Sequence, residues 1–356
     1  MTYAKAMLPL LMRHLPLATI LCGNNLQGIS IAANQTVKAT GYWTGGMKRF
    51  VWERAHLSKL INSYGVKTLY TPYQVATQPK RVASICALRN LEPFFAHHYT
   101  YTKKAGLRNE ILRHLTKRDL TRADVVIAVS DFARDFAVES LKIPQERIVR
   151  IYHGRDESLI GDETETDVQV RHTLNIKGRY ILTAGSILPY RRVEDIIAAF
   201  DTAIASLDPD AKLIVAGTGS DSGYKKKLER VIAASQNGKA IRLIGYVGRP
   251  EMRALYKGCD IFVSASEIEA CPNIGIEAMT AGCAVIAADA GPAREIYGDG
   301  AAFYVPRNTA GLTNWMRTLW CEDRENQALR TRAVVRSRAF SWSDCAKRTA
   351  ELLQSV

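Results

Sequence analysis

The 356-residue chain lacks several motifs that would identify a function at once. It contains no Walker A motif and no G-x-G-x-x-G fingerprint of dinucleotide-binding proteins. No two cysteines have the C-x-x-C spacing of redox and zinc sites, and the seven that occur are scattered and odd in number. We interpret them as reduced core thiols of a cytosolic protein, which excludes a disulfide framework and a structural zinc site.

Long apolar runs are absent as well. The longest near the start, residues 7–22, is interrupted by Arg13 and His14. It falls short of the roughly 20 apolar residues that cross a bilayer, so we expect neither a membrane span nor a signal peptide. With 47% apolar and 23% charged residues, the composition is that of an ordinary globular protein, and the length suggests two domains.

Acidic residues are scarce in the first third of the chain. Residues 1–118 contain 17 Lys and Arg but only 3 Asp and Glu, whereas residues 151–356 contain 26 of each kind. All of the net charge of +13 is therefore carried by the first half. Such asymmetry favours an anionic partner: nucleic acid, a phosphorylated substrate or an anionic membrane. The plainer alternative is a solvated basic face without a partner.

Short apolar runs alternate with helical patterns along the whole chain, which predicts parallel, doubly wound α/β sheets. The strands expected in the second half are residues 180–184, 213–216, 241–244, 261–264, 284–287 and 302–305. Those expected in the first half are residues 17–21, 68–70, 82–87, 125–129 and 148–152. We predict a first domain at 1–154, an acidic linker at 155–168, a second domain at 169–335 and a C-terminal helix at 336–356 that packs back on the first domain.

Ligands of open α/β sheets bind beyond the carboxyl ends of the strands, so the residues that follow each strand matter most. Three of the expected strands end at a glycine: Gly185, Gly217 and Gly245. Glycine lets a ligand approach the backbone closely, although it is also a common strand terminator.

Two glutamates form the most chemically suggestive pair. Glu269 lies in the loop after one strand, and Glu277 lies inside a helix that we expect to begin near Pro272. Free amides at that helix start would bind a phosphate. Arg191, from another strand end, would add a cation. The set suits a diphosphate joined to hydroxylated rings, although spacing alone is also compatible with ordinary surface acids.

An extended series of motifs resembles the large family of retaining GT-B glycosyltransferases with an E-x7-E signature, the "glycosyl transferases group 1". SEIE at 266–269 is followed, after seven residues, by EAMTAGCAVI at 277–286. RRVEDIIAAF at 191–200, GTG at 217–219, GYV at 245–247, LYKGCDIF at 255–262 and FSW at 340–342 agree in order and spacing. ADVVIAVS at 123–130 and IYHG at 151–154 also fit, while residues 1–122 fit weakly.

The resemblance implies two Rossmann-like domains that face each other across a cleft, with the second domain binding the nucleotide-sugar donor. It implies that Glu269 contacts the transferred sugar, Glu277 the ribose and Arg191 the diphosphate. The remaining donor-binding residues that it implies are Gly185, Ser186, Gly217, Tyr246, Val247, Cys271, Pro272, Asn273 and Ile274. No metal and no cofactor besides the donor is implied, because protein cations and a helix dipole stabilise the leaving group in this family.

Two departures from the family pattern stand out. Arg89 occupies the place of a histidine near the acceptor, and we include it among the catalytic candidates; alternatively, it pairs with a surface acid. The chain also begins at what looks like the family's first helix, so we expect the family's first strand to be missing. We expect either a truncated frame or another segment, such as residues 29–33, in the place of that strand.

These observations lead to one expectation about function and two alternatives. We expect a retaining, metal-independent hexosyltransferase for cell-surface polysaccharide. Its acceptor would be a glycan or an anionic lipid-linked molecule, and it would act in the cytoplasm, at the inner face of the plasma membrane. The alternatives are a nucleotide-sugar-binding protein without activity and a basic nucleic-acid-binding protein, which would lack a recognisable helix-turn-helix or zinc motif.

Overall fold

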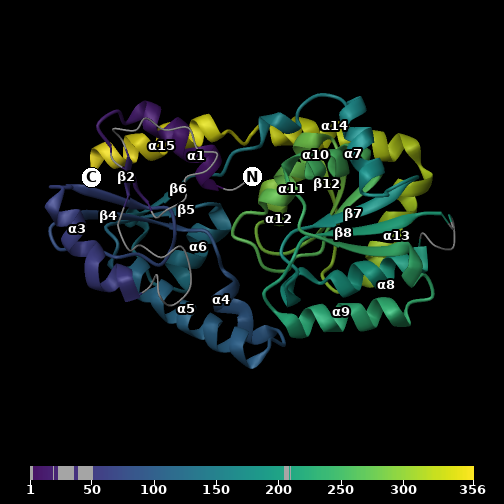
Figure 1. The fold of residues 1–356 in the computed structure, drawn as a ribbon, viewed down its shortest axis with the longest axis horizontal. Coiled ribbons are helices and arrows are strands. Elements are labelled where there is room, and N and C mark those ends of the chain that lie inside the picture. The colour runs from purple at the N-terminus through teal and green to yellow at the C-terminus, as the bar shows by residue number, and fades with distance from the viewer. Residues whose placement is uncertain (1–2, 19, 23–35, 39–50, 204–207, 209) are drawn as a thin grey trace. The chain divides into compact units, whose positions relative to one another are not determined.

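The computed structural model describes residues 3–18, 20–22, 36–38, 51–203, 208 and 210–356 (Figure 1). The chain divides into two compact units. The first unit comprises Met1–Asn90, Leu112–Gly154 and Ser341–Val356. The second comprises Leu91–Ile111 and Arg155–Phe340.

The second unit is built on a six-stranded, wholly parallel sheet. Its strands are β7 (Tyr180–Ala184), β8 (Lys212–Ala216), β9 (Ile241–Gly245), β10 (Ile261–Ser264), β11 (Ala284–Ala288) and β12 (Ala301–Tyr304), in the order β12-β11-β10-β7-β8-β9. The chain proceeds outward from β7 to β9, then returns to β10 on the other side of β7. The strand order therefore reverses between β7 and β10, which is where open α/β sheets bind their ligands.

Helices cover both faces of this sheet. They are α7 (Glu165–Thr173), α8 (Val193–Ala203), α9 (Ser222–Ala234), α10 (Arg249–Gly258), α11 (Asn273–Ala281), α12 (Ala293–Tyr297), α13 (Thr309–Cys321) and α14 (Asp323–Ser337). Helices α8 and α9 lie on one side of the sheet and α7, α10 and α14 on the other (Figure 1). Short polar residues cap the N-termini of several of these helices. The side chains of Asp221, before α9, and Asn308, before α13, accept hydrogen bonds from backbone amides of the first turn.

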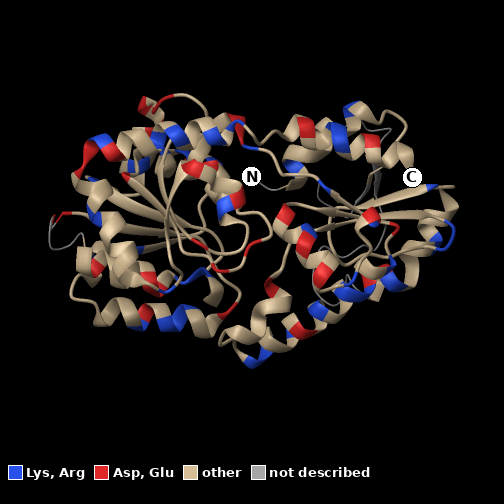
Figure 2. Ribbon diagram, turned by 180° about the vertical axis from the view of Figure 1, so that it is seen from behind, with Lys and Arg blue, Asp and Glu red and all other residues tan. Residues whose placement is uncertain are grey.

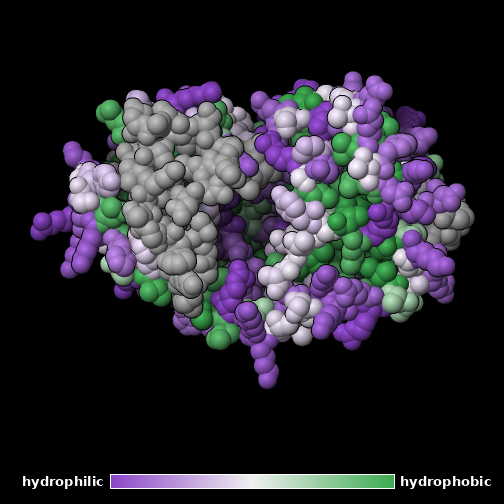
Figure 3. Space-filling view, in the orientation of Figure 1, coloured by the Kyte–Doolittle hydropathy of each residue, from purple (hydrophilic) through white to green (hydrophobic). Residues whose placement is uncertain are grey.

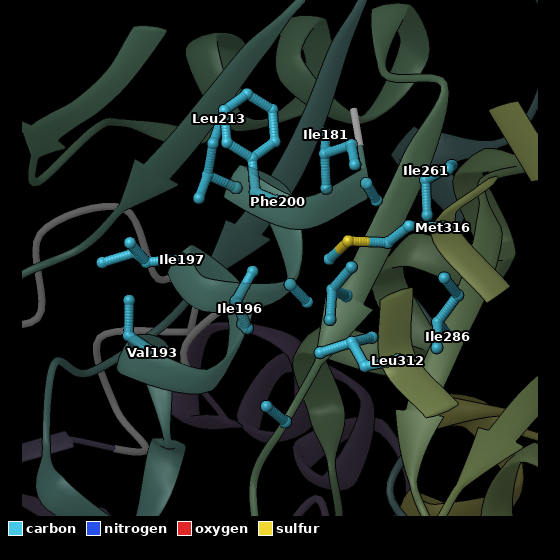
Figure 4. Packing of buried hydrophobic residues seen from close by; sticks show 14 of the residues in the cluster. Ile181, Val193, Ile196, Ile197, Phe200, Leu213, Ile261, Ile286, Leu312 and Met316 are labelled. Carbon is cyan, nitrogen blue, oxygen red and sulfur yellow. The ribbon is translucent and has the colours of Figure 1, made fainter. Parts of the chain in front are cut away.

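The largest buried cluster lies between the sheet and helices α8 and α13. Phe200, fully buried, packs among Ile181, Ile196 and Leu213, and Met316 closes the cluster from α13 (Figure 4). These side chains come from the apolar runs and from the helix faces that the 3.6-residue period predicts. The core therefore fixes the strands whose carboxyl ends form the site described below.

The first unit contains a second parallel sheet with the order β3-β4-β5-β6. Its strands are β3 (Thr68–Thr71), β4 (Ala83–Leu88), β5 (Val125–Ala128) and β6 (Ile148–Arg150), and β1 (Ile20–Cys22) pairs separately with β2 (Thr36–Lys38). The helices nearest in sequence are α1 (Tyr3–His14), α3 (Ser58–Ser63), α4 (Glu92–Phe95), α5 (Lys103–Arg122), α6 (Asp131–Glu139) and α15 (Trp342–Ser355). Cys345, Ala346 and Ala350 of α15 share a core with Met7 and Leu11 of α1.

The expected α/β class and its parallel sheets are confirmed, and most strand bounds agree within one or two residues. The expected linker is partly helical, since it contains a turn at Glu157–Leu159 and the start of α7. The segment at 29–33, offered as a replacement strand, lies outside the described residues. Six of the seven cysteines are described with their side chains and are free: Cys86, Cys259, Cys271, Cys283 and Cys345 are buried, and Cys321 is exposed at the end of α13.

No helix within the described ranges is long and apolar enough to cross a bilayer. The coloured surface in Figure 3 intermixes hydrophilic and hydrophobic residues. Lys and Arg recur along α5, where Lys103, Lys104, Arg108 and Lys117 are exposed (Figure 2).

Candidate active site

The carboxyl ends of β7 and β8 approach each other so closely that only glycine fits at two positions. A Cβ atom on Gly217 would lie 1.8 Å from the carbonyl oxygen of Gly185, and the φ of Gly217 is +135°. Gly185 has a φ of +124°, and a Cβ there would lie 2.7 Å from the Ile274 side chain. The backbone is held in place by hydrogen bonds from the Gly185 amide to Ala216 and from the Gly217 amide to Gly245. Both predicted glycines therefore shape the site through backbone packing.

A small hollow opens at this point, where the strand order reverses. Three of the residues that line it were predicted from the sequence: Gly185, Ser186 and Arg191. The rest of the lining is Thr183, Ala184, Ile187, Val193, Val215, Ala216, Ser264, Ala265 and Ser266. A pocket with small hydroxyl side chains, exposed backbone and one cation suits a polar, anionic ligand.

Arg191 and Glu269 form an ion pair at this pocket. Arg191 Nη1 lies 2.6 Å from Glu269 Oε1, and the two side chains are only 18% and 16% exposed. Arg191 ends a short turn at Pro189–Arg191, and Glu269 lies in the loop between β10 and α11. Arg191 Nε is buried and has no hydrogen-bond partner among the described residues. The pair thus leaves one guanidinium donor for a ligand.

Burial and mutual attraction both shift the pKa values of this pair. It raises the pKa of the Glu269 carboxyl above its ordinary value, and Arg191 and Ser266 offset part of that rise. Burial acts to lower the pKa of Arg191, but attraction to Glu269 outweighs it and raises that pKa above its ordinary value. Burial also raises the pKa of Tyr190, which precedes Arg191, to about 12. Arg191 therefore stays charged, and a ligand anion must compete with Glu269 for it.

Helix α11 begins at Asn273, within the range that the sequence predicts, with Pro272 as the residue before its first turn. Glu277, one turn inside the helix, is half-buried and accepts a hydrogen bond from Tyr256 at 3.3 Å. Gly275 allows close packing, since a Cβ there would lie 2.1 Å from the hydroxyl oxygen of Tyr297. The first turn of α11 therefore packs directly against the buried Tyr297.

The other predicted donor-binding residues lie around the same sheet edge, outside the lining of the pocket. Cys271 and Pro272 are buried in the loop that leads into α11, and Ile274 touches Gly185 from its first turn. Tyr246 follows β9 and is 81% exposed, with Val247 beside it half-buried. Asn273 is half-buried at the start of α11.

Arg89 belongs to the first unit, where aromatic side chains hold it. Its guanidinium carbon lies 3.9 Å from the centre of the Tyr3 ring and 5.8 Å from that of Tyr73. Nη1 donates to the carbonyl oxygen of Pro72 at 3.0 Å. Arg89 therefore interacts with aromatic rings and a carbonyl oxygen, not with the surface acid that we considered as an alternative partner. The role of Arg89 near an acceptor stays a prediction.

Sequence reasoning missed the hydroxyl groups of the pocket and the partners of Glu267. Thr183 and Ser264 are strand residues, and nothing in the alternation of β7 and β10 marks them as pocket-facing. Glu267 is held by Arg307 and Tyr99, both distant in sequence. Only tertiary structure could bring those residues together.

No group of three or more His, Cys, Asp or Glu residues suited to a metal ion occurs within the described ranges. His97 and His98, adjacent in sequence, have ring centres 4.0 Å apart in an edge-to-face arrangement.

Comparison with known families decides the class of the protein. Residues 165–334 match the family "Glycosyl transferases group 1", and residues 41–159 match "Glycosyltransferase Family 4". The chain thus carries a glycosyl transferases group 1 domain, preceded by a glycosyltransferase family 4 domain. The two matches cover most of both units of this glycosyltransferase.

Among characterised relatives, the glycosyltransferase is similar to the serotype-specific mannosyltransferase WbdA of Escherichia coli. The two are 23% identical over 265 residues, which is 74% of this chain and 32% of WbdA. The chain thus spans about a third of the length of that relative.

Two solved structures show the same fold. WaaG, a glycosyltransferase involved in lipopolysaccharide biosynthesis, matches with a TM-score of 0.75 and 13% identity over 99% of this chain and 94% of that one. HepE of Anabaena, determined in complex with UDP-glucose, matches with a TM-score of 0.72 and 19% identity over 91% and 92% of the two chains. The fold of this glycosyltransferase is therefore GT-B.

Proposed function

We propose that this glycosyltransferase is a retaining hexosyltransferase that takes its sugar from a nucleotide-sugar donor. The product would be a cell-surface polysaccharide, in line with the role in lipopolysaccharide biosynthesis stated for WaaG. The observation that carries the proposal is the buried Arg191–Glu269 pair beside a polar pocket at the switch point of the sheet. HepE, of the same fold, binds UDP-glucose, which supports a sugar nucleotide as the ligand class.

In the proposed complex, different residues of the protein bind the diphosphate, the sugar and the ribose of the donor. The diphosphate takes the free donor of Arg191, the Ser186 region and the positive end of the α11 dipole. The sugar hydroxyls donate to Glu269, which gives up part of its pairing with Arg191 to the phosphates. Glu277 accepts from the ribose. A buried cation is worth more to a diphosphate here than in water, because solvent screening is weak.

The proposed reaction retains the configuration at the anomeric carbon. The bond from that carbon to the donor phosphate breaks, and the acceptor oxygen forms its new bond on the same face. The acceptor's proton passes to the departing phosphate oxygen. Arg191 stabilises the charge that develops on the phosphate, so we propose that no metal ion or additional cofactor is needed.

We propose a glycan or an anionic lipid-linked molecule as the acceptor, reached at the cytoplasmic face of a membrane. The basic residues of α5 support this location, since each juxtamembrane cation contributes about 1 kcal/mol at an anionic surface. Two alternatives remain candidates: a nucleotide-sugar-binding protein without activity and a nucleic-acid-binding protein. Measured sugar transfer would exclude the first, and nucleic-acid affinity at physiological salt tests the second.

Substitution of the two glutamates tests the proposal. Glu269→Ala and Glu277→Ala are each expected to lower donor hydrolysis or transfer at least about tenfold, because each removes a charge-assisted hydrogen bond. Glu229→Ala, at an exposed glutamate of α9, is the matched control and should keep the wild-type rate. Melting temperatures show whether the variants are folded. Wild-type rates in both site variants would refute the assignment.

A further inference from the structure

Glu267 lies two residues before Glu269 and is held from two sides. Arg307 Nε and Nη2 donate to its two carboxylate oxygens at 2.7 and 2.9 Å, a bidentate arrangement. The Tyr99 hydroxyl donates to the same carboxylate. The Glu267 side chain is only 10% exposed. A nearly buried carboxylate with three donors is firmly fixed.

The backbone of Glu267 holds a second connection, to the turn that carries Arg191. Its amide donates to the carbonyl oxygen of Tyr190 at 2.9 Å. The ring of Tyr99 also packs edge-on against that of Tyr190, with centres 6.5 Å apart. Glu267 therefore ties the loop of Glu269 to the turn of Arg191, and its own side chain is tied down by Arg307 and Tyr99.

Both partners are themselves anchored. Arg307 follows β12 with a φ of 66°, a conformation that non-glycine residues seldom adopt, and its guanidinium carbon lies 5.9 Å from the centre of the Tyr99 ring. Tyr99 belongs to the Leu91–Ile111 segment, which clusters with the second unit. Three residues later, Thr102 donates its amide and its hydroxyl to the buried Asp221 at 2.8 and 3.0 Å.

We propose that Tyr99, Glu267 and Arg307 form a brace that positions Glu269 opposite Arg191 for sugar transfer. The inference rests on the proposed function of that pair. The three are positioning residues, since the lining of the pocket includes none of them. Removing a hydrogen bond to Glu267 should make the loop that carries Glu269 more mobile and leave the groups that contact the diphosphate in place. Such a substitution should therefore slow the chemical step and leave the affinity for the nucleoside diphosphate unchanged.

Two variants and a matched control test the brace. Arg307→Met and Tyr99→Phe are each expected to lower kcat about five- to twentyfold, the usual effect of losing hydrogen bonds to a charged group. Affinity for UDP or GDP, whichever the wild type binds, should stay within about twofold. Arg307→Lys should recover part of the lost rate. Arg294→Met breaks a similar ion pair with Asp289, neither residue of which lines the pocket, and should have no effect.

Hydrogen exchange separates failure of this inference from failure of the proposed function. Peptides covering residues 265–272 should exchange faster in Arg307→Met and Tyr99→Phe than in the wild type or in Arg294→Met. That result would support the brace even if the wild type transferred no sugar. Unchanged exchange in both brace variants would overturn the inference, as would a loss of nucleotide affinity with kcat intact.

Discussion

At the scale of single residues, the site is organised around the ion pair of Arg191 with Glu269. Arg191 and Glu269 lie 2.6 Å apart and are largely buried, so removing either leaves the other charge without compensation. In the donor complex that we propose, a phosphate would replace Glu269 as the partner of Arg191, and sugar hydroxyls would pair with Glu269.

The chemistry of these residues could be predicted from sequence, but their contacts could not. The spacing of Glu269 and Glu277 and the motif around Arg191 are local patterns. The direct contact of Arg191 with Glu269 depends on the adjacency of β7 and β10, which are separated in sequence by two strands. The brace of Glu267 depends on Tyr99 and Arg307, which no local pattern connects.

A glycine at the strand end offers a test at this scale. Gly217→Ala is expected to lower the free energy of unfolding by at least about 2 kcal/mol, because its Cβ meets the Gly185 carbonyl oxygen and its φ suits glycine alone. Gly106→Ala is the control: it has open space inside α5 and should stabilise the chain by about 0.5–1 kcal/mol. Chemical denaturation measures both. Equal stability of the two variants would contradict the close approach of β7 and β8.

At the scale of elements, the strands were predictable because each is a short apolar run between polar turns. The fully buried strand β11, for example, has a continuous apolar sequence. Helix starts were predictable where a capping residue or proline marks them, as before α11. The association of Leu91–Ile111 with the second unit could not be predicted, because it depends on long-range hydrogen bonds such as that of Thr102 to Asp221.

Asp221 gives the second unit a pH-dependent anchor. Burial acts to raise its pKa, but hydrogen bonds from Thr102, Tyr224 and Gly223 outweigh burial and hold the pKa below 3.8, its ordinary value. The carboxylate therefore contributes stability above that ordinary value, and the contribution is lost as the pH falls through the pKa of the folded state.

Asp221→Asn should therefore cost stability at neutral pH and little in acid. We expect a loss of about 1.5–3 kcal/mol at pH 7, the range for hydrogen bonds to a charged group. The difference from the wild type should shrink as the pH falls below about 4. Thermal melts across the pH range measure it, with the exposed Asp299→Asn as control. A difference that is constant from pH 7 to pH 3 would contradict the anchor.

At the scale of the whole molecule, charge and fold point to different tasks for the two halves of the sequence. The basic excess is confined to residues 1–150, while the ion pair and its pocket belong to the second unit. Family resemblance could predict the GT-B fold, because the order of motifs is retained along the chain. It could not predict which basic residues are exposed, as Lys103, Lys104, Arg108 and Lys117 of α5 are.

Binding to vesicles tests the proposed membrane contact. The chain should bind vesicles with anionic lipid and not neutral ones, and salt should weaken the binding. Lys104→Glu combined with Arg108→Glu, on the exposed side of α5 beside Leu107, should reduce binding at least about tenfold. Lys225→Glu with Lys226→Glu, on exposed α9, is the control. Equal binding to neutral vesicles, or tighter binding to DNA, would contradict this explanation of the charge.

The central claim is that a sugar nucleotide binds at the Arg191–Glu269 pocket. It is tested most directly by a thermal-shift and calorimetric screen of UDP-, GDP- and ADP-sugars against the wild type and Arg191→Ala, each with a chelator present. We predict that at least one sugar nucleotide raises the Tm of the wild type and is hydrolysed despite the chelator. Arg191→Ala should bind it at least about tenfold more weakly, because the buried cation is gone. A wild type that binds no sugar nucleotide, a strict need for a divalent metal, or undiminished binding by Arg191→Ala would contradict the account.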